Sequence, residues 1–160
     1  MLVDSNILPQ CFAVPGSFGG LMTLYEANFI KLNQLISGLE KHAGMQLSKA
    51  GTDCHLHLTI EARTKYTCEL RLTYLFDGDA VKDDQEVADP DLMAKVFFDA
   101  RMAEVQSWID SPRHELLRAL QGRYHRELDL RWNRNIMFSK WLDYLLENGH
   151  FFPSPGRIRG

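Results

Sequence analysis

The sequence predicts a single α+β domain in which an antiparallel sheet packs against helices from both ends of the chain. Apolar residues recur at three- and four-residue steps near both ends and alternate with polar residues in the middle. The first pattern is that of an amphipathic helix, and the second is that of a strand with one buried face. The length of 160 residues suits one domain with its own core. We expect a four-stranded meander packed against an N-terminal helix and one or two C-terminal helices.

The expected domain covers residues 21–152. Residues 1–20 contain several prolines and glycines and are typical of an irregular lead-in, and residues 153–160 are expected to form a flexible tail. The first helix is predicted within 21–40, LMTLYEANFIKLNQLISGLE, where leucines and aromatic residues recur at helical spacing. The next stretch, KHAGMQLSKAGTD, is expected to be a connector.

A first hairpin is predicted for residues 54–74. Apolar and polar residues alternate on both sides of Arg63-Thr64-Lys65, so the pattern assigns each side chain to one face. A three-residue loop at 63–65 keeps apolar residues opposite apolar residues. The predicted pairs are Ala62 with Tyr66, Ile60 with Cys68, Leu58 with Leu70, and Leu56 with Leu72. This register also places Arg71 opposite His57.

A second hairpin is predicted from the apolar residues of VFFDARMAEV, with its turn centred on Ala100-Arg101. This turn pairs Phe98 with Ala103 and Val96 with Val105. Asp99 suits the first position of a type I turn, because its side chain can accept a hydrogen bond from the turn backbone. The charged residues here are therefore explained by a turn without any chemistry.

Two helices are expected near the C-terminus. A short one begins at Asp110-Ser111-Pro112 and stops near Gly122, and a longer one around residues 136–146 ends at Asn148-Gly149. The residues expected in the core are Phe29, Leu32, Leu58, Tyr66, Leu70, Leu72, Val96, Phe98, Trp141 and Leu145.

Composition excludes several classes of protein. The net charge of −3 and the pI near 6.0 disfavour a dedicated nucleic-acid binder, which is usually basic. The three cysteines have no C-x-x-C spacing and suit reduced thiols. The first residues do not form a convincing signal peptide, and no run approaches the roughly 20 apolar residues of a membrane span. We therefore expect a cytoplasmic protein.

Four stretches together resemble a known family. These are LMTLYEANFIKLNQLI, TIEARTKYTCELRL, VFFDARMAEV and WLDYLLENGH, and they are similar to the YqiB-like family of small bacterial proteins, classed as a domain of unknown function. The resemblance covers roughly residues 21–150. It implies no activity, because none is established for the family, and the shared motifs look structural rather than catalytic. Leu130 stands where the family has a glutamate.

Three motifs suggest an ion or phosphate site, and for each the simpler reading is favoured. His55-x-His57 has metal-ligand spacing on a strand, but a solvated sheet face explains it. The acidic residues 77–91 lack the arrangement of a calcium loop. Residues 16–20, GSFGG, precede a helix as a phosphate loop does, without its lysine. We expect no metal and no cofactor.

The remaining polar candidates lie on the helices and the second hairpin. Asn28 and Asn135 fall within apolar stripes, where each amide needs partners. They either tie the first helix to the last or line a pocket with Glu26 and Asp129. The basic stretch 113–140 forms either an ordinary amphipathic surface or a site for an anion or RNA. Candidate ligand-binding residues are Glu26, Asn28, Asp99, Arg101, Glu104, Arg131 and Asn135.

No catalytic constellation emerges from these residues. Asp99 and Glu104 suit mutual salt bridging with nearby basic residues better than paired acid–base work. The sequence therefore favours a non-enzymatic binding or regulatory protein for a protein partner or a small anionic metabolite. The alternatives are an enzyme acting on nucleotides or phosphorylated compounds, and an RNA-associated protein.

Overall fold

The computed structural model of the chain describes residues 17–50, 54–76, 87–108 and 127–156. Within these ranges the chain forms two long helices, a short 3₁₀ turn and five strands. In chain order they are α1 (Phe18–Leu35), η2 (Leu39–Lys41), β1 (Met45–Lys49), β2 (Cys54–Arg63), β3 (Thr67–Phe76), β4 (Val87–Phe97), β5 (Met102–Trp108) and α3 (Glu127–Glu147). The predicted short helix at 110–122 lies outside the described residues.

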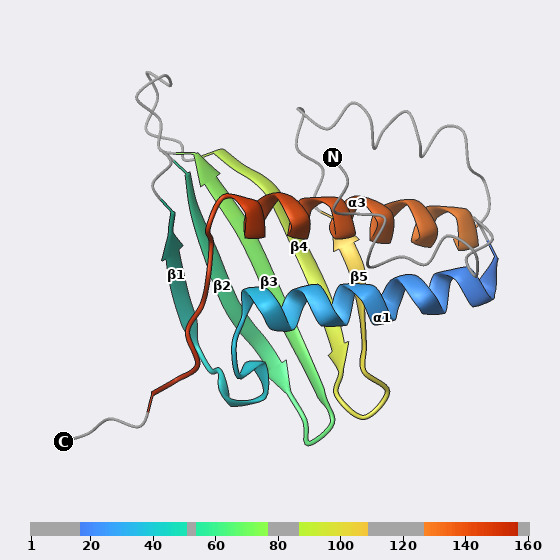
Figure 1. The fold of residues 1–160 in the computed structure, drawn as a ribbon, viewed down its shortest axis with the longest axis horizontal. Helices are drawn as coiled ribbons and strands as arrows, with labels where there is room; N and C mark the ends of the chain where they lie inside the picture. The colour runs from blue at the N-terminus through green and yellow to red at the C-terminus, as the bar shows by residue number, and fades with distance from the viewer. Residues whose placement is uncertain (1–16, 51–53, 77–86, 109–126, 157–160) are drawn as a thin grey trace.

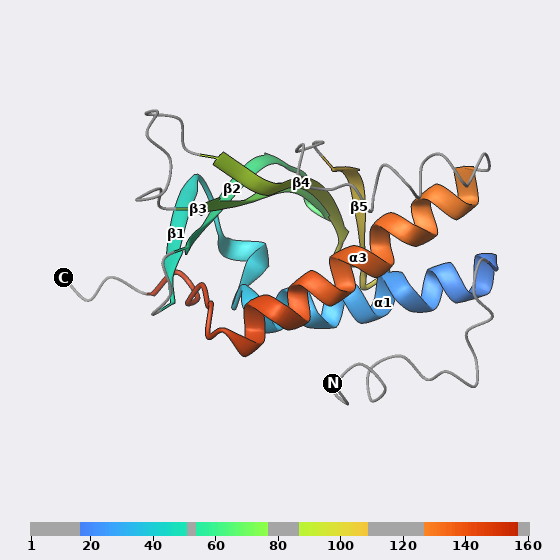
Figure 2. The ribbon, with the colours of Figure 1, turned by 90° about the horizontal axis from the view of Figure 1, so that it is seen from above.

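The strands form one antiparallel sheet in the order β1-β2-β3-β4-β5, so each strand pairs with its neighbour in the chain. Both helices lie against the same face of the sheet, which curves over them (Figures 1 and 2). The predicted α+β domain with an antiparallel meander is thus confirmed, but the predicted number of strands is wrong. The fifth strand is β1, which lies in the expected connector.

β1 was not predicted because its apolar residues face solvent and a polar residue faces the core. Met45 and Leu47 are exposed, whereas Ser48 is buried. Sequence patterns identify strands by an apolar side that faces the core. In β1 the core-facing side is polar, because Ser48 contacts a buried histidine described below.

The first hairpin has a different register from the predicted one. Leu58 lies opposite Leu72, and Ile60 lies opposite Leu70. The turn is tighter than predicted, since the Thr64 N–H donates to the Thr67 carbonyl at 2.9 Å, and a β-bulge follows Ile60. An even loop plus one bulged residue keeps the same faces as an odd loop, so the pattern could not distinguish them.

Two predictions fail with that register. Tyr66 lies in the turn with 52% of its surface exposed instead of in the core. Arg71 lies opposite Thr59 instead of His57, and it forms a bidentate ion pair with the buried carboxylate of Asp91 on the neighbouring strand.

The second hairpin turns one residue earlier than predicted, with its centre at Asp99-Ala100 instead of Ala100-Arg101. Residues 98–101 form the turn, and Arg101 adopts a left-handed conformation with φ of 55°. The pairing is again displaced from the prediction: Val96 lies opposite Ala103, and Phe97 lies opposite Met102. Ala94 lies opposite Val105, and a bulge between Met93 and Ala94 then brings Leu92 opposite Trp108.

Both long helices end as their sequences suggest. The Ser17 side chain accepts a hydrogen bond from the Gly20 N–H and caps α1, which begins earlier than the predicted start at residue 21. After α3, Gly149 adopts a positive φ of 83°, which glycine tolerates.

The main core lies between the two helices and the sheet. Of the residues predicted there, Leu32, Leu58, Leu70, Leu72, Val96 and Leu145 are buried, and Phe29, Phe98 and Trp141 pack against it half-buried.

A row of polar residues runs through the contact between α1 and α3. The Asn28 side-chain amide donates to the Asn135 carbonyl at 3.2 Å. One turn further along, the fully buried Lys31 ammonium donates to Ser139 Oγ at 2.7 Å and to Asp143 Oδ2 at 2.8 Å. These bonds fix how the two helices lie against each other, and they support the prediction that Asn28 and Asn135 tie the first helix to the last.

The residues after α3 return to the opposite edge of the sheet. His150 is buried, with Nδ1 3.1 Å from Ser48 Oγ and Nε2 3.4 Å from the Tyr74 hydroxyl. Burial lowers the pKa of His150, because a charged imidazolium is poorly solvated there. The Phe152 N–H then donates to the Leu35 carbonyl at 2.8 Å, so this segment joins the end of α1.

Candidate functional site

α1 and α3 both extend beyond β5, the last strand of the sheet (Figures 1 and 2). In this overhang the helices cannot bury their apolar sides against the sheet, and they form a second, smaller apolar cluster. Its members are Leu21, Leu24 and Tyr25, with Met22, Met102, Trp132 and Ile136 packed against them. The cluster lies beside an open groove.

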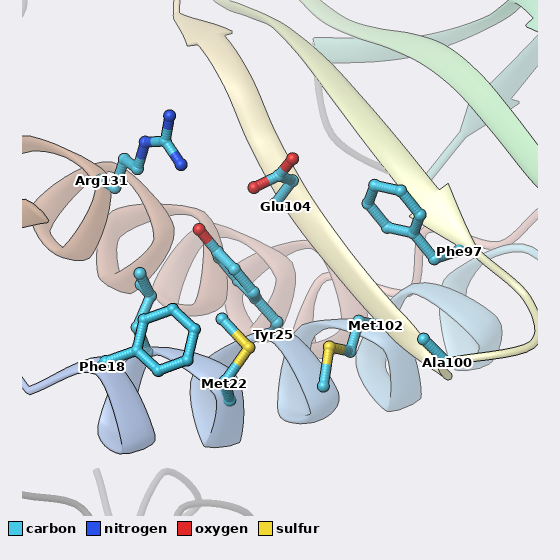
Figure 3. Close-up of a pocket in the computed structure, with 9 residues that line it drawn as sticks. Phe18, Met22, Tyr25, Phe97, Ala100, Met102, Glu104 and Arg131 are labelled. Carbon is cyan, nitrogen blue, oxygen red and sulfur yellow. The ribbon is translucent and has the colours of Figure 1, made fainter.

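The groove lies between the first turns of α1 and the end of the β4–β5 hairpin (Figure 3). Its volume is about 520 Å³, which is within the usual range for small-ligand sites. Apolar side chains form most of its wall, and Glu104 and Arg131 supply the charged groups. The lining residues are Phe18, Leu21, Met22, Tyr25, Phe97, Ala100, Met102, Glu104 and Arg131.

The Tyr25 hydroxyl points toward the polar end of the groove, beside the Glu104 carboxylate (Figure 3). Tyr25 is 6% exposed, and its hydroxyl oxygen is buried with no hydrogen-bond partner of good geometry among the described residues. Burial, reinforced by the Glu104 carboxylate, raises the pKa of Tyr25 to about 12, although Arg131 and Arg134 oppose the increase. The hydroxyl is therefore a neutral donor at physiological pH.

A smaller polar cavity of about 220 Å³ adjoins the groove through Glu104 and Arg131. Arg134 lines this cavity and donates from Nη1 to the Gln106 carbonyl at 2.9 Å. The polar end of the groove thus faces two guanidinium groups and one carboxylate. Glu104 acts more strongly on the Tyr25 hydroxyl than either arginine does.

Asn135 sets the position of α3 relative to this end of the sheet. Its Oδ1 accepts a hydrogen bond from the Val105 N–H at 2.8 Å, and its Nδ2 donates to the Arg131 carbonyl at 2.8 Å. Val105 belongs to the edge strand β5, whose outward N–H needs a partner. By supplying that partner, Asn135 places the Arg131 turn of α3 next to Glu104.

A second open groove of about 800 Å³ lies on the other side of the β4–β5 turn. Phe29, Ile30 and Phe98 give it an apolar floor. Its other lining residues are Glu26, Asn33, Glu40, Lys65, Ala100 and Arg101. Charges of both signs surround this groove, so it selects no particular ligand charge.

The structure distributes the predicted site residues over several places. Glu104 and Arg131 share the first groove, and the second groove has Glu26 and Arg101 in its lining. Asn28 and Asn135 are buried between the helices, away from both grooves. Asp99 is exposed in the turn and lines neither groove. The side chain of Asp129, which was expected beside the asparagines, lies outside the described residues.

Sequence reasoning missed the residue at the centre of the polar end. Tyr25 falls in the apolar stripe of α1 and was assigned to the core side of the helix. Met22, Phe97 and Met102 were not singled out either. Only the overhang of α1 beyond β5 turns these residues into the wall of a groove, and no pattern in the sequence specifies that overhang.

Within the described ranges, no three His, Cys, Asp or Glu side chains gather closely enough to hold a metal ion. On β2, His55 lies opposite Leu75 and His57 lies opposite Thr73. No helix in the described part of the chain is both long and apolar enough to cross a membrane.

Comparison with protein families finds a match, over residues 31–151, to the family described as "Protein of unknown function (DUF1249)". The match includes the whole sheet, α3 and the C-terminal end of α1 from Lys31 onward. Comparison with curated proteins and with solved structures finds no match in either set.

Proposed function

Because the family match spans most of its length, the chain belongs to the DUF1249 family of proteins of unknown function, and we propose that it is a non-enzymatic binding protein. Its ligand is a small anionic molecule with an apolar body, which occupies the groove between α1 and the β4–β5 hairpin. The observation that carries this proposal is the Tyr25 hydroxyl. It is a buried donor beside the Glu104 carboxylate, without a hydrogen bond of good geometry among the described residues, at the polar end of an apolar groove.

The apolar wall supports a ligand with a hydrocarbon or aromatic body. Phe18 is 67% exposed, and Met22, Phe97 and Met102 are half-buried. Covering such surface stabilises a complex by roughly 25 cal/mol per Å² of apolar area removed from water. Two of these side chains are methionines, which adapt to different apolar shapes because they are flexible and polarisable.

The charges at the polar end favour an anionic head group. Two cations, Arg131 and Arg134, and one carboxylate, Glu104, act on the Tyr25 hydroxyl, and all three line the polar cavity beside it. A guanidinium binds a carboxylate or phosphate through two parallel hydrogen bonds, and a neutral tyrosine hydroxyl donates a further bond. A head group placed there would offer the Tyr25 hydroxyl an acceptor of better geometry than the Glu104 carboxylate provides.

The enzymatic alternative has less support. It required Asp99 and Glu104 to work together, but Asp99 lies exposed in the hairpin turn, outside the groove that Glu104 lines. For the RNA-associated alternative, much of the basic stretch lies outside the described residues. Of its arginines, Arg134 already donates to the β5 backbone.

Thermal unfolding of the full chain with octanoate, and separately with 1-octanol, tests the proposal. The two probes share an apolar body and differ in charge. Octanoate at about 100 times its Kd should add about 2.7 kcal/mol of stability, which raises the Tm by several degrees, whereas 1-octanol should bind more weakly.

Three variants locate the site. Tyr25→Phe and Arg131→Gln should each weaken the octanoate shift. Lys140→Gln removes an exposed cation further along α3 and should leave the shift unchanged. Equal shifts with both probes would refute the preference for an anion, and a shift that persists in both groove variants would refute the site.

A further inference from the structure

The two edge strands of the sheet differ in whether their outward backbone groups form hydrogen bonds. At β5 the outer edge is covered by α3, because Asn135 accepts from the Val105 N–H and Arg134 donates to the Gln106 carbonyl. At the other edge lies β1 (Figure 1). Nothing in the described ranges forms a hydrogen bond with the outward backbone of β1.

The register identifies which residues of β1 face outward. The Ile60 N–H donates to the Gly44 carbonyl at 2.9 Å, which makes this a hydrogen-bonded pair. Bonded and non-bonded pairs alternate along antiparallel strands. Met45, Leu47 and Lys49 therefore form non-bonded pairs with β2, and each directs its N–H and carbonyl away from the sheet.

The side chains of these residues are also exposed. Met45 is 73% exposed and Leu47 is 44% exposed. Edge strands of soluble proteins are commonly protected by charged side chains, proline or a covering segment. β1 has a charge only at its end, Lys49, and otherwise combines an open backbone edge with two exposed apolar side chains, which is the arrangement that another strand recognises.

We propose that β1 pairs with β1 of a second copy of this chain, antiparallel about a two-fold axis at Leu47, so that the two sheets become continuous. In this register Leu47 lies opposite Leu47 of the second copy, and Met45 lies opposite Lys49 of the second copy. Each of these residues both donates to and accepts from the facing strand. The side chains that meet on the outer face are apolar at the axis.

The position of the charge in β1 favours a second copy of the same strand in antiparallel orientation. Lys49 is the charged residue of β1, and antiparallel pairing about Leu47 sets its stem beside Met45 of the second copy. Parallel pairing in register would place Lys49 beside Lys49, and like charges directly opposite are destabilising. The strand is thus complementary to its own antiparallel copy, as a two-fold interface requires. The inference is independent of the ligand groove, which lies at the β5 edge.

Sedimentation velocity of the full chain, from micromolar to millimolar concentration, tests this inference. We expect a monomer–dimer equilibrium. Leu47→Lys places like charges across the axis and should raise the dimer dissociation constant at least about tenfold. Ile30→Lys introduces the same charge at an exposed apolar residue of α1 and should leave the equilibrium unchanged.

Amide hydrogen exchange gives a readout at single residues. Gln46 and Ser48 face β2, so their amides should be protected at every concentration. The amides of Met45, Leu47 and Lys49 should become protected only as the dimer forms. A chain that stays monomeric at millimolar concentration would overturn the inference. So would a dimer that survives Leu47→Lys or leaves these amides unprotected.

Discussion

Lys31 and Asp143 form an ion pair inside the contact between α1 and α3, with Nζ 2.8 Å from Oδ2 and both side chains almost completely buried. A buried ion pair repays the desolvation of its charges only when the geometry is good and further hydrogen bonds are made. Here the Lys31 ammonium also donates to Ser139. The pair therefore specifies how the helices align more than it adds to stability.

Lys31→Met should destabilise the fold by about 3–5 kcal/mol, because it leaves the Asp143 carboxylate buried without its cation. The double variant Lys31→Met/Asp143→Leu should recover most of the loss, since no uncompensated charge remains. Urea denaturation measures both values. Lys140→Met, on the exposed side of α3, is the control and should change stability by less than about 0.5 kcal/mol. A double variant no more stable than Lys31→Met would contradict this account.

Asn135→Ala should cost about 1–3 kcal/mol, because it leaves the buried Val105 N–H without an acceptor. Asn148→Ala is a matched control. Asn148 makes the same local bond to the carbonyl four residues earlier, but at an exposed position and without a strand contact. Hydrogen exchange should show faster exchange of the Val105 amide in Asn135→Ala only. Unchanged exchange at Val105 would show that this bond does not hold α3 to β5.

Stability should fall with acidification below about pH 6.5 through His150. Its folded-state pKa is lowered by burial, so the unfolded chain binds a proton more readily. The stabilisation is therefore present above the unfolded-state pKa of about 6.5 and is lost as the pH falls toward the folded-state value. Urea denaturation from pH 8 to pH 5 measures the slope. His150→Gln should flatten that slope, and an identical slope in the variant would exclude His150 as its source.

Tyr25 should titrate later than ordinary tyrosines, because its pKa is raised to about 12. Subtracting the 295 nm titration of Tyr25→Phe from that of the wild type isolates this residue. Glu104→Gln should lower the pKa, since the carboxylate contributes to the increase. The stabilisation is complete below the unfolded-state pKa of about 10 and is lost as the pH rises through about 12. A Tyr25 titration near pH 10 would contradict the buried environment.

The helices and both hairpins were predictable because their periods are properties of the sequence itself. The registers were not. In the first hairpin, a bulge beside Ile60 adds a residue and compensates for an even loop, and in the second, Val96 meets Ala103 instead of the equally apolar Val105. The alternation of apolar and polar residues is the same whether the strands are joined by an odd loop or by an even loop with a bulge. Both arrangements place the apolar residues of the two strands on the same face of the sheet.

The candidate site was predictable only in part. Glu104 and Arg131 were selected from the sequence, and the structure places them in one groove. Tyr25 and Lys31 were not recognised, because a tyrosine in an apolar stripe suggests core and a lysine on a helix suggests surface. Their roles depend on how α1 crosses α3 and overhangs β5, which is a long-range relationship.

The pairing of α1 with α3 also sets a delay during synthesis of the protein. Asn28 and its partner Asn135 are 107 residues apart in the chain. At about 5–20 residues per second, a ribosome needs roughly 5–20 s to travel between them. For that time the apolar and polar sides of α1 have no α3 to pack against. During synthesis, the side of α1 that carries Asn28 therefore stays uncovered until α3 has been made.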